Sequence, residues 1–303
     1  MSLFRHRELT YYFFGLRAGV ANLVSNGLRL GVKKTAGKIL QPVNSYTRFP
    51  EYYWFDRAIS GHLAGLAAGG RAAVLDVGSP KLLGLYLAAK AAADLTLTDI
   101  SEINIDEYKI MWKALEKRAR GKANFLLQDA RQLQFADAAF DIVYSMSVLE
   151  HIEGDGGDSA AIGELLRVLK PGGLLVLSVP FGASYVEQKR VGFSGAARKT
   201  GDQKAYFFQR IYDEATFEQR IMRHLAGVSE VYVTTVQRTR PWIPRGLGAL
   251  GENLRGLLGG LNPVFSAMGN RSIENVHPFV TRYGEFHSAK DVYGDLILTA
   301  RKN

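Results

Sequence analysis

The 303-residue chain contains no cysteine, and this absence removes several classes of protein at once. Without thiols there is no disulfide framework, no thiolate zinc site, no cysteine nucleophile and no cysteine-held iron–sulfur cluster. A chain without disulfides fits a reducing compartment, so a cytoplasmic location is expected. Charged residues make up 22% and hydrophobic residues 47% of the chain, which excludes wholesale disorder and fibrous designs.

The beginning of the chain also lacks an apolar run long enough to cross a membrane. Its first two uncharged runs, Leu9–Leu16 and Ala18–Leu28, hold eight and eleven residues, whereas a membrane-spanning helix needs roughly 20. Arg17 interrupts the apolar stretch and no clear cleavage site follows it, so a secretory signal peptide is not expected. We therefore expect a protein that is soluble or bound peripherally to a membrane.

Positive charge is concentrated in the first 50 residues. That segment carries eight Lys or Arg against Glu8 alone, which gives it a net charge of +7 out of +9 for the whole chain. From Phe13 to Leu28, apolar residues recur at helical spacing on one face. This pattern favours an interfacial helix that binds an anionic membrane surface through residues 1–40; packing on the rest of the protein is the equal alternative. A nucleic-acid partner is disfavoured, because no aromatic–basic recognition motif accompanies the charge.

The middle of the chain alternates short apolar runs with helical patterns, which is typical of a parallel sheet with helical crossovers. The expected elements are, in order, strand 72–78, helix 82–92, strand 95–99, helix 105–120, strands 124–127 and 140–144, helix 159–169 and strand 173–179. A helix at 213–225 and strands at 230–236 and 295–300 follow.

Two zones flank this region. Residues 1–70 form an N-terminal extension or lid, and residues 71–303 form one α/β domain with an insertion at about 240–292. The extension ends in an expected helix whose aromatic residues either cover the ligand or pack on the sheet: Tyr46, Tyr52, Tyr53 and Trp54. Within the insertion, leucines at helical spacing from Leu247 to Leu261 alternate with glycines. Such a segment should become ordered only when docked on the domain, a second subunit of a homo-oligomer, or lipid.

The expected strands place carboxylates at one edge of the sheet. Asp76 and Gly78 end the first strand, Asp99 ends the second, and Asp129 and Ala130 follow the third. Open parallel sheets bind ligands at the carboxyl ends of their strands, and a carboxylate after the second strand is suited to accept hydrogen bonds from ribose hydroxyls. Each carboxylate also has a local alternative, as a helix cap or in an Asx turn.

Three motifs together resemble the class I S-adenosylmethionine-dependent methyltransferases. They are VLDVG in the first strand, VLEHI after the fourth, and LKPGG, which begins 17 residues after the end of VLEHI. The resemblance covers about residues 70–180 well and the last two strands loosely. It implies a Rossmann-like sheet of seven strands in the order 3-2-1-4-5-7-6, with the last strand antiparallel and helices on both faces. It also implies S-adenosylmethionine as cofactor.

The same resemblance implies the residues of the site. The cofactor would be bound by Asp76, Gly78, Ser79, Asp99, Ile100, Asp129, Ala130, Ser145 and Met146. Glu150, His151, Arg210 and Tyr212 would lie on the acceptor side, with surface packing as the alternative for Arg210 and Tyr212. His151 is the candidate general base because imidazole titrates near neutral pH; shaping the pocket is its structural alternative. We expect no metal, since no carboxylate cluster accompanies these residues.

One departure from the family concerns the loop after the first strand. The family usually carries three closely spaced glycines there, whereas this chain reads Gly78-Ser79-Pro80-Lys81-Leu82. Either the loop is rebuilt and still binds the cofactor, or the site is degenerate and the fold serves as a binding or scaffolding module. The retained carboxylates favour a working site.

The sequence thus predicts S-adenosylmethionine-dependent methyl transfer to oxygen of a small or amphiphilic acceptor, such as a sugar, a glycan precursor or a lipid-linked intermediate. A non-catalytic cofactor-binding protein is the alternative. An RNA methyltransferase is less favoured, and a nicotinamide dehydrogenase is least favoured because no GxGxxG follows the first strand.

Overall fold

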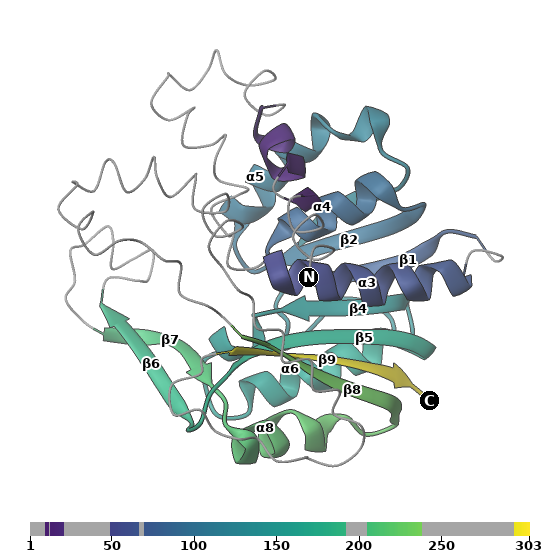
Figure 1. Cartoon of the computed structure of the whole chain (residues 1–303). Helices are drawn as coiled ribbons and strands as arrows, with labels where there is room; N and C mark the ends of the chain where they lie inside the picture. The colour runs from purple at the N-terminus through teal and green to yellow at the C-terminus, as the bar shows by residue number, and fades with distance from the viewer. Residues whose placement is uncertain (1–9, 12, 21–48, 67–69, 192–204, 238–293) are drawn as a thin grey trace.

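The computed structural model describes residues 10–11, 13–20, 49–66, 70–191, 205–237 and 294–303 (Figure 1). Residues 21–28, which are half of the predicted interfacial helix, and the whole predicted insertion therefore lie outside the described residues. Within the described part of the chain, no helix has both the length and the apolarity to span a bilayer.

A seven-stranded sheet in the order β3-β2-β1-β4-β5-β9-β8 forms the centre of the molecule. Its strands are β1 (Ala72–Val77), β2 (Ala93–Asp99), β3 (Lys122–Leu127), β4 (Phe140–Met146), β5 (Leu169–Phe181), β8 (Val228–Gln237) and β9 (Gly294–Lys302). β1 to β5 pair in parallel, and β9 runs antiparallel to both β5 and β8. The predicted strand order and its antiparallel last strand are confirmed.

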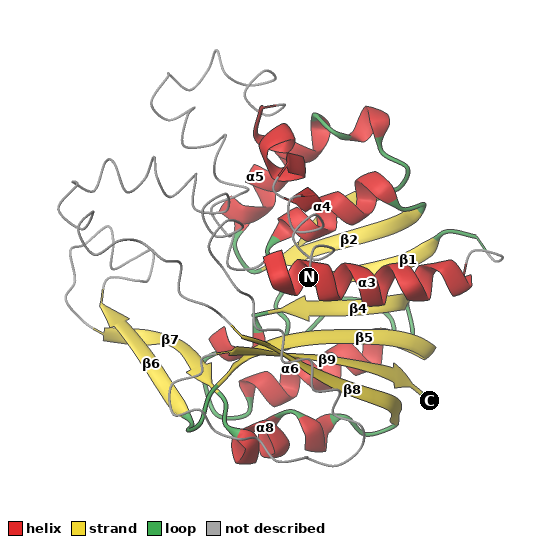
Figure 2. Cartoon of the chain, in the orientation of Figure 1, coloured by secondary structure: helices red, strands yellow, loops and turns green. Residues whose placement is uncertain are grey.

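Helices cover both faces of this sheet (Figure 2). They are α3 (Phe49–Leu66), α4 (Lys81–Lys90), α5 (Glu102–Lys113), α6 (Gly157–Val168), α8 (Glu214–Arg220) and the short 3-10 helices η4 (Glu116–Arg118), η5 (Leu149–His151) and η6 (Met222–His224). One buried cluster joins α3, α4 and α5 to the sheet, and a second joins α6 and α8 to its other face. Alternate residues of β5 belong to different clusters, as the two-residue period of a strand requires.

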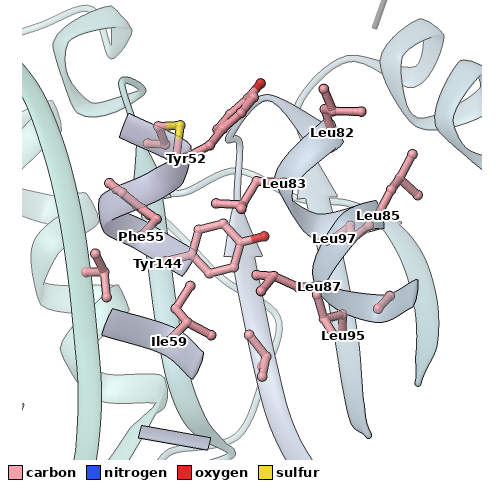
Figure 3. Close-up of a cluster of buried hydrophobic side chains, with 14 of the residues drawn as sticks. Tyr52, Phe55, Ile59, Leu82, Leu83, Leu85, Leu87, Leu95, Leu97 and Tyr144 are labelled. Carbon is pink, nitrogen blue, oxygen red and sulfur yellow. The ribbon is translucent and has the colours of Figure 1, made fainter. Parts of the chain in front are cut away.

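The aromatic residues of α3 pack on the sheet. Tyr52, Phe55 and Ile59 are fully buried and lie toward Tyr144 of β4 (Figure 3), and the Phe55 and Tyr144 rings meet edge to face with centroids 6.0 Å apart. Each such side chain contributes about 1.5–3 kcal/mol through burial. Tyr52 therefore packs on the sheet, which is one of the two predicted alternatives, whereas Tyr46 lies outside the described residues.

The described start of the N-terminal stretch also packs on the protein, through Leu16 of the predicted apolar face and through residues outside that face. Tyr11 is buried between Tyr52 and Tyr86, with ring centroids 5.7 and 5.0 Å away. Its hydroxyl donates to Asp56 at 2.7 Å. Phe13, which was assigned to the membrane-facing side, is 62% exposed.

Two differences from the predicted elements matter for the site. The expected helix 105–120 ends at Lys113 and continues as η4. More importantly, an antiparallel pair outside the main sheet, β6 (Val186–Val191) and β7 (Ala205–Ile211), was not predicted. The residues of β6 are mostly polar, so the sequence indicates no buried strand there. Figure 1 shows the pair set apart from the central sheet.

Candidate cofactor and acceptor site

The turn after β1 brings the chain close to the segment that follows β4. Gly78 has a φ of +69°, a conformation that side chains other than glycine rarely adopt. A Cβ at this position would lie 2.8 Å from Cγ1 of Val148. Gly78 also donates its backbone N–H to the carbonyl of Thr98 at 3.0 Å. Glycine is therefore required here for both conformation and close approach.

A buried ion pair occupies the rest of the loop. Lys81 is 1% exposed, and its ammonium donates to Oδ1 of Asp76 at 2.7 Å and to the carbonyl of Ser79 at 2.6 Å. The backbone N–H of Ser79 donates to the same Asp76 oxygen at 3.1 Å. Burial raises the pKa of the Asp76 carboxyl, and the Lys81 ammonium opposes that rise. The lysine thus holds together a loop that lacks the usual glycines.

Most polar side chains predicted to touch the cofactor are turned inward instead. Ser79 Oγ accepts a hydrogen bond from the backbone N–H of Met146 at 2.8 Å, and Ser145 Oγ donates to the carbonyl of Val77 at 2.9 Å. The side chains of Asp76, Ser79, Ser145 and Met146 are all at most 1% exposed. These side chains therefore join β1 to β4 through hydrogen bonds and packing.

Asp99 keeps the position predicted for it at the end of β2. Its Oδ1 accepts from the backbone N–H of Ser101 at 2.9 Å, and its Oδ2 accepts from Nδ2 of Asn104 at 3.2 Å. Each carboxylate oxygen can accept a second hydrogen bond, so the group retains acceptor capacity for a diol. Ile100 beside it is 70% exposed and offers an apolar surface at the same edge.

Asp129 forms an Asx turn, which is the local alternative to a role in ligand binding. Its carboxylate accepts from the backbone N–H of Arg131 at 2.9 Å in an Asx turn, and the Arg131 guanidinium donates to both of its oxygens. Arg131 lowers the pKa of this carboxyl. Ala130 is half-buried against the second core cluster. An exocyclic amine would have to compete with Arg131 for Asp129.

His151 lies in η5, against the unpredicted pair of strands. Its Nδ1 is 2.6 Å from the carbonyl oxygen of Phe208 in β7, and the two rings meet with centroids 5.1 Å apart. A carbonyl can only accept, so Nδ1 carries the proton and Nε2 carries the lone pair in the neutral ring. Glu150 is fully buried, with its Oε1 3.7 Å from Nε2 of His151.

Arg210 and Tyr212, which were predicted on the acceptor side with surface packing as the alternative, are both buried. Arg210 is 2% exposed and donates to the carbonyls of Ile152 at 2.5 Å and Gly154 at 2.7 Å. Tyr212 is fully buried and donates its hydroxyl to Asp158 at 2.8 Å. Burial and the Asp158 carboxylate raise the pKa of that hydroxyl. Arg210 thus holds the segment that follows His151, whereas Tyr212 is bonded to α6.

A buried carboxylate that the sequence did not indicate completes the site. Glu51 of α3 is fully buried, and its Oε1 accepts from the hydroxyls of Ser178 at 2.7 Å and Ser147 at 3.0 Å. These serines stand at the carboxyl ends of β5 and β4. The only available signal was Ser178 at a position where the alternation of β5 calls for a buried apolar residue.

Comparison with known proteins agrees with this architecture. Residues 75–177, which run from β1 to β5, match a methyltransferase domain family. The fold and this match define a class I S-adenosylmethionine-dependent methyltransferase domain. Among relatives, the sterol 24-C-methyltransferase of Gibberella zeae is 30% identical over 138 residues, covering 43% of this chain and 34% of that protein.

Two further likenesses are more distant. The sterol 24-C-methyltransferase of Eremothecium gossypii is 28% identical, covering 50% of this chain and 45% of that protein. The chain thus spans less than half the length of both sterol methyltransferases. A solved structure of Haemonchus contortus phosphoethanolamine N-methyltransferase 2 with S-adenosyl-L-methionine has a TM-score of 0.44 at 18% identity, covering 80% of this chain and 52% of that one.

The residues at the carboxyl edge fit S-adenosylmethionine, the methyl donor of this class of domain. Asp99 and Ile100 suit a ribose and an adenine, and the positive φ of Gly78 allows close backbone approach. The Asp76 side chain is fully buried, and its Oδ1 is bonded to Lys81. The loop after β1 thus differs from the glycine-rich loop of the family and is held by the bond from Lys81 to Asp76.

Proposed function

We propose that this protein transfers a methyl group from S-adenosylmethionine to an oxygen atom of a small or amphiphilic acceptor, such as a sugar, a glycan precursor or a lipid-linked intermediate. The match of residues 75–177 to a methyltransferase domain carries the proposal of methyl transfer. The bound sulfonium supplies an activated methyl group, so the protein's task is to align the acceptor and exclude water.

The geometry of His151 supports oxygen as the acceptor atom. A hydroxyl must lose its proton as its oxygen takes the methyl group, and a neutral imidazole is suited to receive that proton near pH 7. The hydrogen bond from Nδ1 to the Phe208 carbonyl orients the ring and leaves Nε2 as the proton acceptor. In this proposal, β7 therefore orients the His151 ring for its role as general base.

The acceptor class is open to a direct test. Two relatives are named for methylation of a sterol at carbon, which favours an amphiphilic acceptor but not oxygen. The protein should be incubated with methyl-labelled S-adenosylmethionine and separate lipid and water-soluble extracts. Label in an ether or ester product supports the proposal, whereas label on carbon alone would contradict the assignment of oxygen.

The rebuilt loop favours one second candidate, a non-catalytic S-adenosylmethionine-binding or scaffolding protein. Pro80 and Leu82 stand where the family has its second and third glycines, and the Lys81–Asp76 pair lies buried in the same loop. This alternative predicts cofactor binding without label transfer to any extract.

The assignment of Asp99 can be tested separately by calorimetry. Asp99→Ala should weaken S-adenosylhomocysteine binding by about 1.5–3 kcal/mol, the range for hydrogen bonds to a charged group. Asp129→Ala is the matched control and should change binding less, because Arg131 already occupies that carboxylate. If wild type binds and Asp99→Ala binds equally well, the ribose contact is assigned to the wrong residue.

A further inference from the structure

The chain leaves β4 through a residue whose backbone conformation is unfavourable. Ser147, which directly follows β4, has a φ of +50°, in the left-handed region where a Cβ crowds the neighbouring carbonyl oxygen. Residues with such a φ persist only where the surrounding structure holds them, and they gather at functional sites. The conformation therefore costs stability, and the contacts of Ser147 indicate what it achieves.

Contacts to β5 and α3 fasten Ser147 in this conformation. Its backbone N–H donates to the carbonyl of Ser178 at 3.0 Å and to Oγ of the same residue at 3.1 Å. Its own hydroxyl donates to Oε1 of Glu51 at 3.0 Å, and the Ser178 hydroxyl donates to the same oxygen at 2.7 Å. The backbone and the side chain of Ser147 are thus linked to one carboxylate oxygen, directly and through Ser178.

The direction in which the chain leaves β4 decides where the following turn lies. Val148 lies against Gly78 so closely that a Cβ there would be 2.8 Å from its Cγ1. The Val148 carbonyl accepts from the backbone N–H of His151 at 2.9 Å, which closes the turn of η5. The Nδ1 atom of His151 in turn is 2.6 Å from the Phe208 carbonyl oxygen. A rotation at Ser147 would move both ends of this turn.

We propose that Ser147 is a positioning residue of the candidate site. Its left-handed backbone, held from α3 and β5, directs the turn from Val148 to His151, so that one end lies against Gly78 and the other places the imidazole beside β7. The inference rests on the proposed function where it concerns the cofactor and the general base. The orientation of the His151 ring, however, is measurable without any ligand.

Replacing Ser147 by alanine and by glycine separates its conformation from its hydroxyl. Both changes remove the bond to Glu51, but only alanine keeps the Cβ that disfavours a positive φ. NMR of the full chain with isotope-labelled histidine, at a pH where the ring is neutral, reports the proton on His151, whose signal is the one lost in His151→Gln. We expect the form protonated on Nδ1 in wild type and Ser147→Gly, and a mixture of both neutral forms in Ser147→Ala. The same signal in both variants would overturn the proposal.

Calorimetry with S-adenosylhomocysteine tests the end of the turn that contacts Gly78. Ser147→Ala should weaken binding about tenfold, the equivalent of the cost of one left-handed residue, and Ser147→Gly should stay within about twofold of wild type. Equal affinities in the two variants would contradict the role of Ser147 at the cofactor loop. Failure of wild type to bind would refute the proposed function instead, and the NMR comparison would still decide whether Ser147 positions His151.

Two further variants separate positioning from general stability. Ala138, just before the other end of β4, has a φ of +51°, so Ala138→Gly should raise the urea midpoint without changing the His151 signal. Ser178→Ala leaves Ser147 in place but removes the hydroxyl between it and Glu51, and it should shift the His151 signal as Ser147→Ala does. Adding Ser147→Gly to Ser178→Ala should restore the signal, because glycine needs no fastening. A shift that glycine does not restore would overturn the proposal, even if Ser147→Ala fails to fold.

Discussion

At the scale of single residues, Lys81 fastens a loop in which Pro80 and Leu82 stand where the family has glycine. Its ammonium bonds both Asp76 and the Ser79 carbonyl. Removing one partner of a buried ion pair leaves an uncompensated charge and costs about 3–5 kcal/mol. We expect Lys81→Met to lose unfolding free energy in this range, as measured by urea denaturation. Lys109→Met, at an exposed pair with Asp106, should change it little.

The same variant should show a characteristic pH dependence. Without the ammonium, burial raises the pKa of the Asp76 carboxyl further above its unfolded value, so the native state holds a proton that the unfolded state releases. Stability then falls as the pH rises between those two values. The loss of unfolding free energy in Lys81→Met, relative to wild type, should therefore be smaller at pH 5 than at pH 8. A constant deficit would show that the cost arises from packing alone.

At the scale of elements, β6 and β7 support the acceptor side of the site. Phe208 and Arg210 are two residues apart in β7, and both form hydrogen bonds with the segment from His151 to Gly154. The planar guanidinium reaches two carbonyls at once, which a lysine cannot do. In Arg210→Lys, amide exchange in residues 149–156 should accelerate about tenfold, equivalent to about 1.4 kcal/mol. Arg131→Lys serves as the exposed control; unchanged exchange in Arg210→Lys would mean that β7 does not hold this segment.

At the scale of the whole molecule, the basic N-terminal stretch remains the proposed contact with an anionic membrane. Tyr11 packs in the core, so a deletion would remove core contacts, and charge substitution is the cleaner test. Replacing Lys33, Lys34 and Lys38 with Gln should weaken binding to anionic vesicles by about 1 kcal/mol of binding free energy per charge. Vesicle flotation measures this change. Binding should weaken with salt and be absent on neutral vesicles. Equal recovery of variant and wild type would remove these lysines as the anchor.

The sequence by itself determined the sheet and the edge at which ligand binding is proposed. Buried strands are continuous apolar runs, and their carboxyl ends follow from chain direction, so Asp99 and Gly78 could be located from local pattern alone. Tertiary structure decided which polar groups near this edge are turned inward. Asp76 and Lys81 pair across a turn, Glu51 meets Ser178 from another element, and Arg210 reaches the loop after His151. These contacts depend on burial and on partners distant in the chain, because desolvation makes a buried charge stable only where packing brings it a partner.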